Sequence, residues 1–236
     1  MAGEELHYQL QWLVIPVGGI TIKNEGVREY RGSQCYYLTA RTQLNKFLQN
    51  LFDVRYFVES YLDKESLCSL KFVKTRFTKG EQSRVDIDFY PQNNSAVFSV
   101  SGSSPSFKIS ASRGKIENNH PLTQKIPPRT QDLLSSFYYF RLQDIKAGES
   151  LPMNIYYDQR NFPVKMLVGE SFRSEIRKVG IFWVFEANPG SGINEYIMGG
   201  RKFKVYFTAD SRRIPVEFKL STALGSLHAI IEDTPR

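Results

Sequence analysis

Two carboxylates, two residues apart, could carry acid–base chemistry in this chain. Asp86 and Asp88 alternate with Val85, Ile87 and Phe89, so in a strand both carboxylates point to one face. Paired carboxylates can transfer protons in glycoside hydrolysis, and they can bind a cation. The same alternation is typical of a strand with one solvated face and one buried face. We favour the solvated face and keep hydrolysis as an alternative.

No other residues have the spacing of a catalytic or metal site. His7, His120 and His228 are far apart in the sequence, and neither cysteine has a second ligand at metal-binding spacing. The sequence has no Gly-x-Ser-x-Gly motif, and its serines lack an evident base. We therefore expect no metal, no cofactor and no enzymatic activity.

The two cysteines, Cys35 and Cys68, leave the redox state open. In an exported protein they can form one disulfide, and otherwise they are separate thiols on strands. Their spacing says nothing about the distance between them. Both alternatives therefore stand at this point.

Residues 130–141 are typical of a helix, whereas the rest of the chain reads as strands. Its apolar positions and a terminal arginine recur at three- and four-residue steps: Leu133, Leu134, Phe137, Tyr138 and Arg141. Thr130 is the expected N-cap, and Asp132 suits the positive end of the helix dipole. Pro127 and Pro128 prevent an earlier start.

This helix supplies most of the candidate ligand-binding residues. They are Leu134, Phe137, Tyr138, Arg141 and Arg213. The apolar three would insert into a curved sheet. With the helix inside the barrel, Arg141 would lie at a rim, where it would hold a carboxylate or a phosphate. For Arg141, the alternative is an internal salt bridge to Asp210 or Asp132.

The remaining chain indicates about a dozen strands. Residues 43–52 predict a short helix or an irregular crossing, and residues 101–128 are the most loop-like, with a polar strand at 107–113. A closed barrel of about a dozen strands is too wide for its own side chains to fill. We therefore predict an all-β fold with one helix, in a single β-barrel-like domain over residues 1–236. Its antiparallel sheet would be a strongly curved, open β-barrel or β-spiral, with the helix packed in or over the concave side.

The composition permits several partners but requires none. The formal charge is +7 and the pI about 9.3, and the basic residues Lys71, Lys74, Arg76 and Lys79 form either a solvated face or a functional patch. No nucleic-acid motif accompanies this charge, so we expect no nucleic acid. No run of 18 apolar residues predicts a membrane-spanning helix. Met1-Ala2-Gly3 runs directly into a strand-like segment, as in a mature exported domain whose signal peptide has been removed.

Several segments, in order, resemble the DUF3108 family, a bacterial envelope family known as a domain of unknown function. The first is Gly3-Glu4-Glu5-Leu6-His7-Tyr8 followed by Gly18-Gly19. The second runs from Asp132 to Arg141, and the third from Ala209 to Val216 before Gly225-Ser226-Leu227. The resemblance implies an exported protein with a curved barrel-like fold, and it brings no catalytic residues.

These observations predict a non-enzymatic periplasmic or outer-membrane-associated protein that binds a lipid or another amphiphile. Its curved sheet would leave a cavity lined by Leu, Phe and Tyr beside the helix, and peripheral membrane association would fit this role. The alternative is a structural or interaction protein with a filled interior. Its basic face, including Lys71, Lys74 and Arg76, would then bind an anionic glycan or a protein partner.

Overall fold

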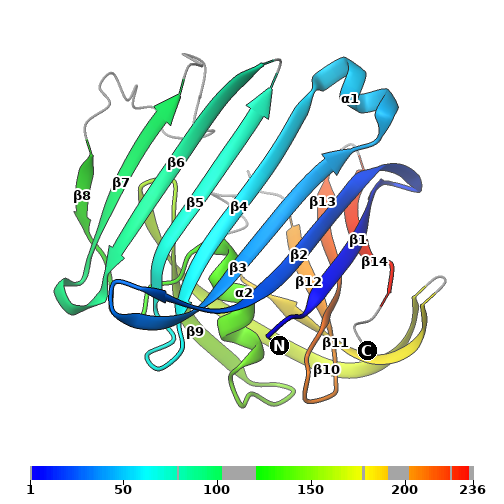
Figure 1. Ribbon diagram of the computed structural model, residues 1–236. Coiled ribbons are helices and arrows are strands. Elements are labelled where there is room, and N and C mark those ends of the chain that lie inside the picture. The colour runs from blue at the N-terminus through cyan, green and yellow to red at the C-terminus, as the bar shows by residue number, and fades with distance from the viewer. Residues whose placement is uncertain are drawn as a thin grey trace.

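The computed structural model describes residues 2–78, 80–102, 121–176, 179–190, 202–223 and 225–233. In these residues the chain forms fourteen strands and two α-helices (Figure 1). The strands are β1 (Glu5–Trp12), β2 (Ile15–Tyr30), β3 (Ser33–Leu44), β4 (Val54–Asp63), β5 (Ser69–Thr78), β6 (Glu81–Tyr90), β7 (Ser95–Gly102), β8 (Leu122–Lys125), β9 (Ser150–Tyr157), β10 (Arg160–Ile176), β11 (Gly180–Asn188), β12 (Lys202–Thr208), β13 (Pro215–Thr222) and β14 (Gly225–Ile231). The strand expected at 107–113, and His120, lie outside the described residues.

All fourteen strands belong to one antiparallel sheet, in the order β8-β7-β6-β5-β4-β3-β2-β1-β14-β13-β12-β11-β10-β9. Two meanders, β1 to β8 and β9 to β14, meet where the first strand pairs with the last and Tyr8 lies opposite Ile231. The alternation of apolar and polar residues explains why these segments form strands with one buried and one partly exposed face. In β6, Val85, Ile87 and Phe89 are buried and the residues between them are partly exposed. The all-β prediction is confirmed.

The sheet curves around the second helix, and its edge strands do not pair with each other in the described part (Figure 1). Residues 126–132 run between the edges. The amide of Ile126 donates to Asn94 O at 2.9 Å, and Gln131 forms an isolated parallel bridge with Ile155. The sheet is therefore not closed, and a β-barrel is not confirmed.

Both helices are short, and each begins later than the sequence indicates. α1 (Lys46–Phe52) lies within the segment expected at 43–52 and is capped by Asn45. α2 (Leu133–Arg141) begins at Leu133 with Asp132 as its N-cap, so the expectation that Thr130 caps it is wrong. The reason is the bridge between Gln131 and Ile155, which keeps the preceding backbone extended. No helix among the described residues is long and apolar enough to cross a membrane.

α2 packs between the two meanders and completes the core. Leu134 and Tyr138 pack with Leu38 of β3 and Leu62 of β4. Further along the helix, Tyr139 and Phe140 belong to the largest core cluster, which comes from β9 to β12. Each such buried side chain contributes about 1.5–3 kcal/mol. The helix thus joins two parts of the sheet that are distant in strand order.

Candidate functional site

Asp132 fixes the start of α2 against the sheet. Its side chain accepts hydrogen bonds from the amides of Leu134 and Ser135, both at 2.8 Å. It also accepts hydrogen bonds from the hydroxyls of Ser60 on β4, at 2.7 Å, and Ser69 on β5, at 2.9 Å. Complete burial raises the pKa of Asp132, and these donors act against that shift. The helix therefore begins at a fixed point of the inner face.

Arg141 fixes the other end of α2. Its guanidinium donates to both carboxylate oxygens of Glu4, at 2.6 and 2.7 Å, and to Arg212 O at 3.2 Å. Only 1% of the Arg141 side chain is exposed. The expectation that Arg141 lies at a rim is wrong, because it closes the buried end of the helix. The alternative of an internal salt bridge is confirmed in kind, although the partner is Glu4 and not Asp210 or Asp132.

The other candidate ligand-binding residues have protein partners of their own. Arg213 donates to the carbonyl oxygens of Gln143 and Ile145, just after α2. Leu134 and Tyr138 are buried, whereas Phe137 is half-buried and packs edge-to-face on Phe218 with 5.2 Å between ring centroids. Ligand binding by these side chains stays a prediction, and of the five only Phe137 and Arg213 keep partial exposure.

A cleft of about 700 Å³ lies beside α2, against β9 and β10. It is lined by Pro128, Arg129, Tyr139, Gln143, Leu151, Pro152, Met153, Asn154, Pro163, Val164 and Lys165. Tyr139, Met153 and Val164 are buried core residues, so they form the inner wall. Arg129 and Lys165 are exposed, so they stand at the mouth. The sequence pattern predicted a cavity beside the helix but did not indicate most of the residues that line this cleft.

A second polar group lies on the inner face, around Lys74 of β5. Its ammonium lies 5.4 Å from the ring centroid of Tyr56 and 5.8 Å from that of Tyr157. Burial lowers the pKa of Lys74 and raises that of Asp158, and each charge partly offsets the shift of the other. Neither carboxylate oxygen of Asp158 has a hydrogen-bond partner among the described residues. These groups form a polar island within an apolar interior.

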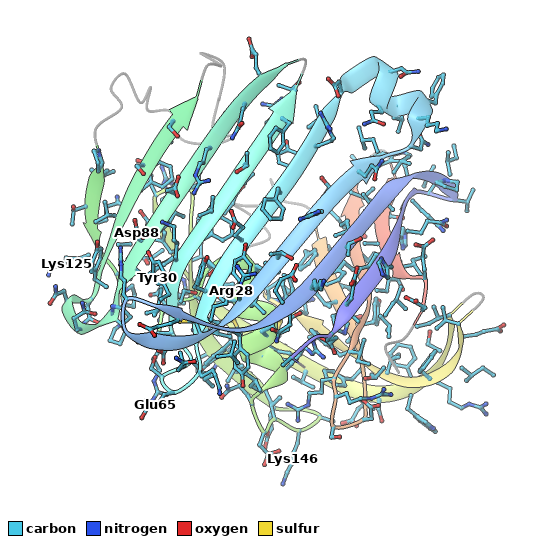
Figure 2. The ribbon with its side chains drawn as sticks, in the orientation of Figure 1. Arg28, Tyr30, Glu65, Asp88, Lys125 and Lys146 are labelled. Carbon is cyan, nitrogen blue, oxygen red and sulfur yellow. The ribbon has the colours of Figure 1, made fainter. Side chains whose placement is uncertain are left out.

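The carboxylates Asp86 and Asp88 lie on the opposite, outer face. Arg84 donates to both oxygens of Asp86, at 2.7 and 3.0 Å. Tyr30 donates to Asp88 at 2.8 Å, and Arg31 lies 2.9 Å from the same carboxylate. Figure 2 shows Tyr30 and Asp88 close together where the end of β2 crosses the sheet. Both carboxylates are neutralised by these partners, which favours the solvated face over a hydrolytic pair.

The basic residues of β5 do not share one face. Lys71 lies 3.7 and 3.5 Å from the carboxylates of Asp86 and Asp88 on the outer face. Lys74 lies opposite Val85, which is a buried residue of the inner face. Arg76 is two residues further along and therefore points the same way as Lys74. The expectation of a single basic face with Lys71, Lys74 and Arg76 is wrong, because the strand alternation separates them.

A chain of hydrogen bonds that the sequence motifs did not indicate links Ser226, His228 and Glu217. Ser226 Oγ lies 2.5 Å from His228 Nε2, and His228 Nδ1 lies 2.6 Å from Glu217 Oε1. This is the order of contacts that activates a serine hydroxyl. The expectation that no serine has a base is therefore wrong. The Ser-x-His spacing was a local signal, but Glu217 joins only through the pairing of β13 with β14.

No group of three or more metal-ligating side chains occurs among the described residues. Comparison with known proteins gives a family and a fold. The family model described as Protein of unknown function (DUF3108) matches residues 7–232. No curated protein matches the chain.

Two solved structures match this chain over most of its length, and the first of them supports the fold. One is a β-barrel-like protein of the domain of unknown function DUF1849 from Brucella abortus, with a TM-score of 0.54, 10% identity, and coverage of 96% of this chain and 94% of that one. The other, from Bacteroides fragilis, is described as a candidate exported protein with a YmcC-like fold. It has a TM-score of 0.33, 7% identity, and coverage of 100% and 97%.

Proposed function

Because this chain belongs to the DUF3108 family of proteins of unknown function, we propose its role from the cleft beside α2. The protein is a non-enzymatic binding protein or carrier for a lipid or another amphiphile. The cleft carries this proposal, because it combines a buried apolar inner wall with two exposed cations at its mouth. Its size falls in the range of about 300–1,000 Å³ that is usual for small-molecule sites.

The lining suits an acyl chain for a second reason. Pro128, Pro152 and Pro163 are among the lining residues, and proline has no backbone N–H that a hydrocarbon would leave without a partner. Arg129 and Lys165 can hold a carboxylate or phosphate head group at the mouth. The apolar tail would then lie along Tyr139 and Val164. We place this protein in the periplasm or at the outer membrane, where an amphiphile needs a carrier.

The first experiment is native mass spectrometry after mild purification, which should find a co-purified amphiphile. The second uses a fluorescent fatty acid, which has an anionic head and an apolar chain. We expect the double variant Arg129→Glu and Lys165→Glu to weaken probe binding by at least about tenfold, because two attractive charges become repulsive.

The matched control is Lys125→Glu with Lys146→Glu. These two lysines are also exposed but do not line the cleft (Figure 2), and the change in net charge is the same. Probe affinity should stay at the wild-type value in this control. Equal losses of probe affinity in both double variants would contradict the proposal. A wild-type protein that binds neither the probe nor a native amphiphile would also contradict it.

A second candidate function, ester hydrolysis, is favoured by the Ser226, His228 and Glu217 contacts. Ser226 Oγ would bond to the carbonyl carbon of an ester while its proton passes to His228 Nε2. The alcohol would leave with that proton, and water would release the acid. The argument against it is the position of β14, between β1 and β13. Its backbone N–H groups pair with those strands, whereas an oxyanion needs free donors.

A fluorophosphonate probe decides between the two functions. Under the carrier proposal we expect no labelling of Ser226, by peptide mass spectrometry of the treated protein. Labelling in the wild type that disappears in His228→Ala and persists in Ser221→Ala would favour the hydrolase. Ser221 is the proper control because it lies directly opposite Ser226 in the same hairpin.

A further inference from the structure

Four large apolar side chains are exposed at one end of the sheet. Leu13 and Val14 in the β1–β2 turn expose 50% and 85% of their surface, Ile15 at the start of β2 exposes 60%, and Phe47 on α1 exposes 72%. Figure 1 shows this turn and α1 at the same end of the molecule. We call these four residues the apolar rim patch.

The residue types in this turn are the opposite of those that a solvent-exposed hairpin turn favours. Trp12 pairs with Ile15, so the turn consists of two residues, Leu13 and Val14. Leu13 has a φ of 56°, in the left-handed region where two-residue turns prefer Gly, Asn or Asp. The left-handed backbone of Leu13 adds strain, and the exposure of both apolar side chains at the tip adds unfavourable hydration. A binding partner that takes these side chains out of water would offset both costs.

Three hydrogen bonds, which involve Ser226 and Asn45, hold the patch in place. The amide of Leu13 donates to Ser226 O at 2.8 Å. Asn45, the N-cap of α1, donates through its amide to Val17 O at 2.9 Å and through its side chain to Pro16 O at 2.8 Å. The β1–β2 turn region and the start of α1 are therefore fixed relative to each other.

The charges around the patch are mostly positive. Arg41, Lys46 and Arg55 are exposed on and beside α1, against a single carboxylate, Asp53, in the same segment. Residues 8–22, which contain the turn, carry no charged side chain. Apolar side chains flanked by cations are the combination that binds an anionic bilayer surface, because apolar insertion and charge attraction add.

We propose that the apolar rim patch docks this protein on a membrane that contains anionic lipid, with Val14 and Phe47 inserted among the lipids. Arg41, Lys46 and Arg55 then face the head groups. The proposal goes beyond the amphiphile-binding function and does not depend on it, since the patch shares no residue with the cleft.

Co-sedimentation with vesicles tests it. The vesicles are phosphatidylcholine alone, or phosphatidylcholine mixed with phosphatidylglycerol. We expect binding to the mixed vesicles, and a loss of about tenfold for each of Val14→Ser and Phe47→Ser, because each removes one inserted side chain. Lys46→Gln and Arg55→Gln should each lower binding about fivefold on the mixed vesicles and leave binding to the neutral vesicles unchanged.

The control variant is Ile181→Ser with Trp183→Ser, because both side chains are 59% exposed on a different strand, β11. It should bind like the wild type. The proposal is overturned if the wild type does not bind the mixed vesicles, or if the β11 variant loses as much binding as the rim variants. It is also overturned if light scattering shows a dimer that Val14→Ser abolishes, since a second copy would then cover the patch. Removal of the cleft cations should not change vesicle binding, which keeps the two proposals separable.

Discussion

Arg141, the last residue of α2, and Glu4, which precedes the first strand, form a bidentate ion pair at 2.6 and 2.7 Å although 137 positions separate them. The pair lies in the core, with side-chain exposures of 1% and 9%. It therefore locks the helix onto the start of the chain. The guanidinium or carboxylate that remained after loss of one partner would be a buried, uncompensated charge.

We predict that Glu4→Gln destabilises the fold by about 3–5 kcal/mol, because it leaves the Arg141 guanidinium buried without its charge partner. Glu4→Leu combined with Arg141→Met should recover most of that loss, since both charges are gone. Urea unfolding followed by circular dichroism measures the free energy of unfolding. Glu5→Gln is the control: Glu5 is the next residue and pairs with Lys23 in solvent, so its loss should stay within about 1 kcal/mol. Equal effects at Glu4 and Glu5 would contradict the buried pair.

Asp132→Ala should be more costly than the loss of an ordinary helix cap. An N-cap alone contributes about 0.5–2 kcal/mol, but Asp132 also accepts from the hydroxyls of Ser60 and Ser69, which would become buried and unsatisfied. We expect a total loss of about 3 kcal/mol or more. Asn45→Ala, which removes the cap of α1, should cost only about 1 kcal/mol. Amide exchange would show α2 opening first in the Asp132 variant, and a loss no larger than that at Asn45 would refute the anchoring role.

The stability of the protein should respond to pH through Asp158. Burial raises its pKa above the ordinary value of 3.8, with Lys74 and Arg160 opposing the shift. The folded protein therefore holds this proton to higher pH than the unfolded chain does. The stability that Asp158 contributes by holding this proton is fully present below the pKa of Asp158 in the unfolded chain. It is lost as pH rises through the pKa of Asp158 in the folded protein. Asp158→Asn should remove this decline in the free energy of unfolding above about pH 4.

Asp210 supplies a control of opposite sign for that experiment. Although burial acts to raise its pKa, hydrogen bonds from Thr208 and Arg212 hold the pKa below its ordinary value. Its stabilisation is present above the unfolded pKa and is lost as pH falls through the folded one. In acid, where both carboxyls are protonated, the free energy of unfolding of Asp210→Asn should therefore approach the wild-type value. The free energy of unfolding of Asp158→Asn should approach the wild-type value in the same pH range. If the free energy of unfolding of Asp158→Asn has the same pH slope as the wild type above the unfolded pKa, the raised pKa is wrong.

Cys35 and Cys68 should both be free thiols. Cys35 lies opposite Asp63 on the neighbouring strand, and the Asp63 amide donates to Cys68 O at 3.0 Å on the other side. The cysteines are thus about two strand spacings, or ~10 Å, apart, beyond the ~7 Å that a disulfide spans. In denaturant without a reductant, a thiol assay should count both. In the folded protein, burial and Asp63 raise the pKa of Cys35 to about 11, so alkylation of this buried thiol should be very slow. A count that rises only after reduction would contradict this arrangement.

Local sequence patterns predicted the helices and strands better than they predicted the contacts between them. The three- and four-residue steps that end at Arg141 located α2, because helical spacing is a local property. Its start was misplaced because Gln131 is held in an extended conformation by Ile155, which no nearby residue indicates. No local sequence pattern indicated the ion pair between Arg141 and Glu4.

The candidate site shows the same limit. The cleft beside α2 is assembled from residues 128–165, whose approach depends on how the helix and the β9–β10 pair pack. Its cations, Arg129 and Lys165, occur in no motif. The inward position of Lys74, by contrast, follows from its parity with Phe72 on β5, so strand alternation in the sequence is enough to indicate it.

The meeting of β1 and β14 in the middle of the sheet has a consequence for how the chain reaches its native state. In the described sheet every other ladder joins strands that follow one another along the chain, whereas this one joins Tyr8 to Ile231. Each hairpin can therefore form as soon as its two neighbouring strands are available, but the outer edge of β1 has no partner until β14, the last strand of the sheet along the chain, is also available. Such a late, long-range closure slows folding and leaves an edge that can pair with other chains. A circular permutant that links β14 to β1 by a short turn would convert this step into one more hairpin.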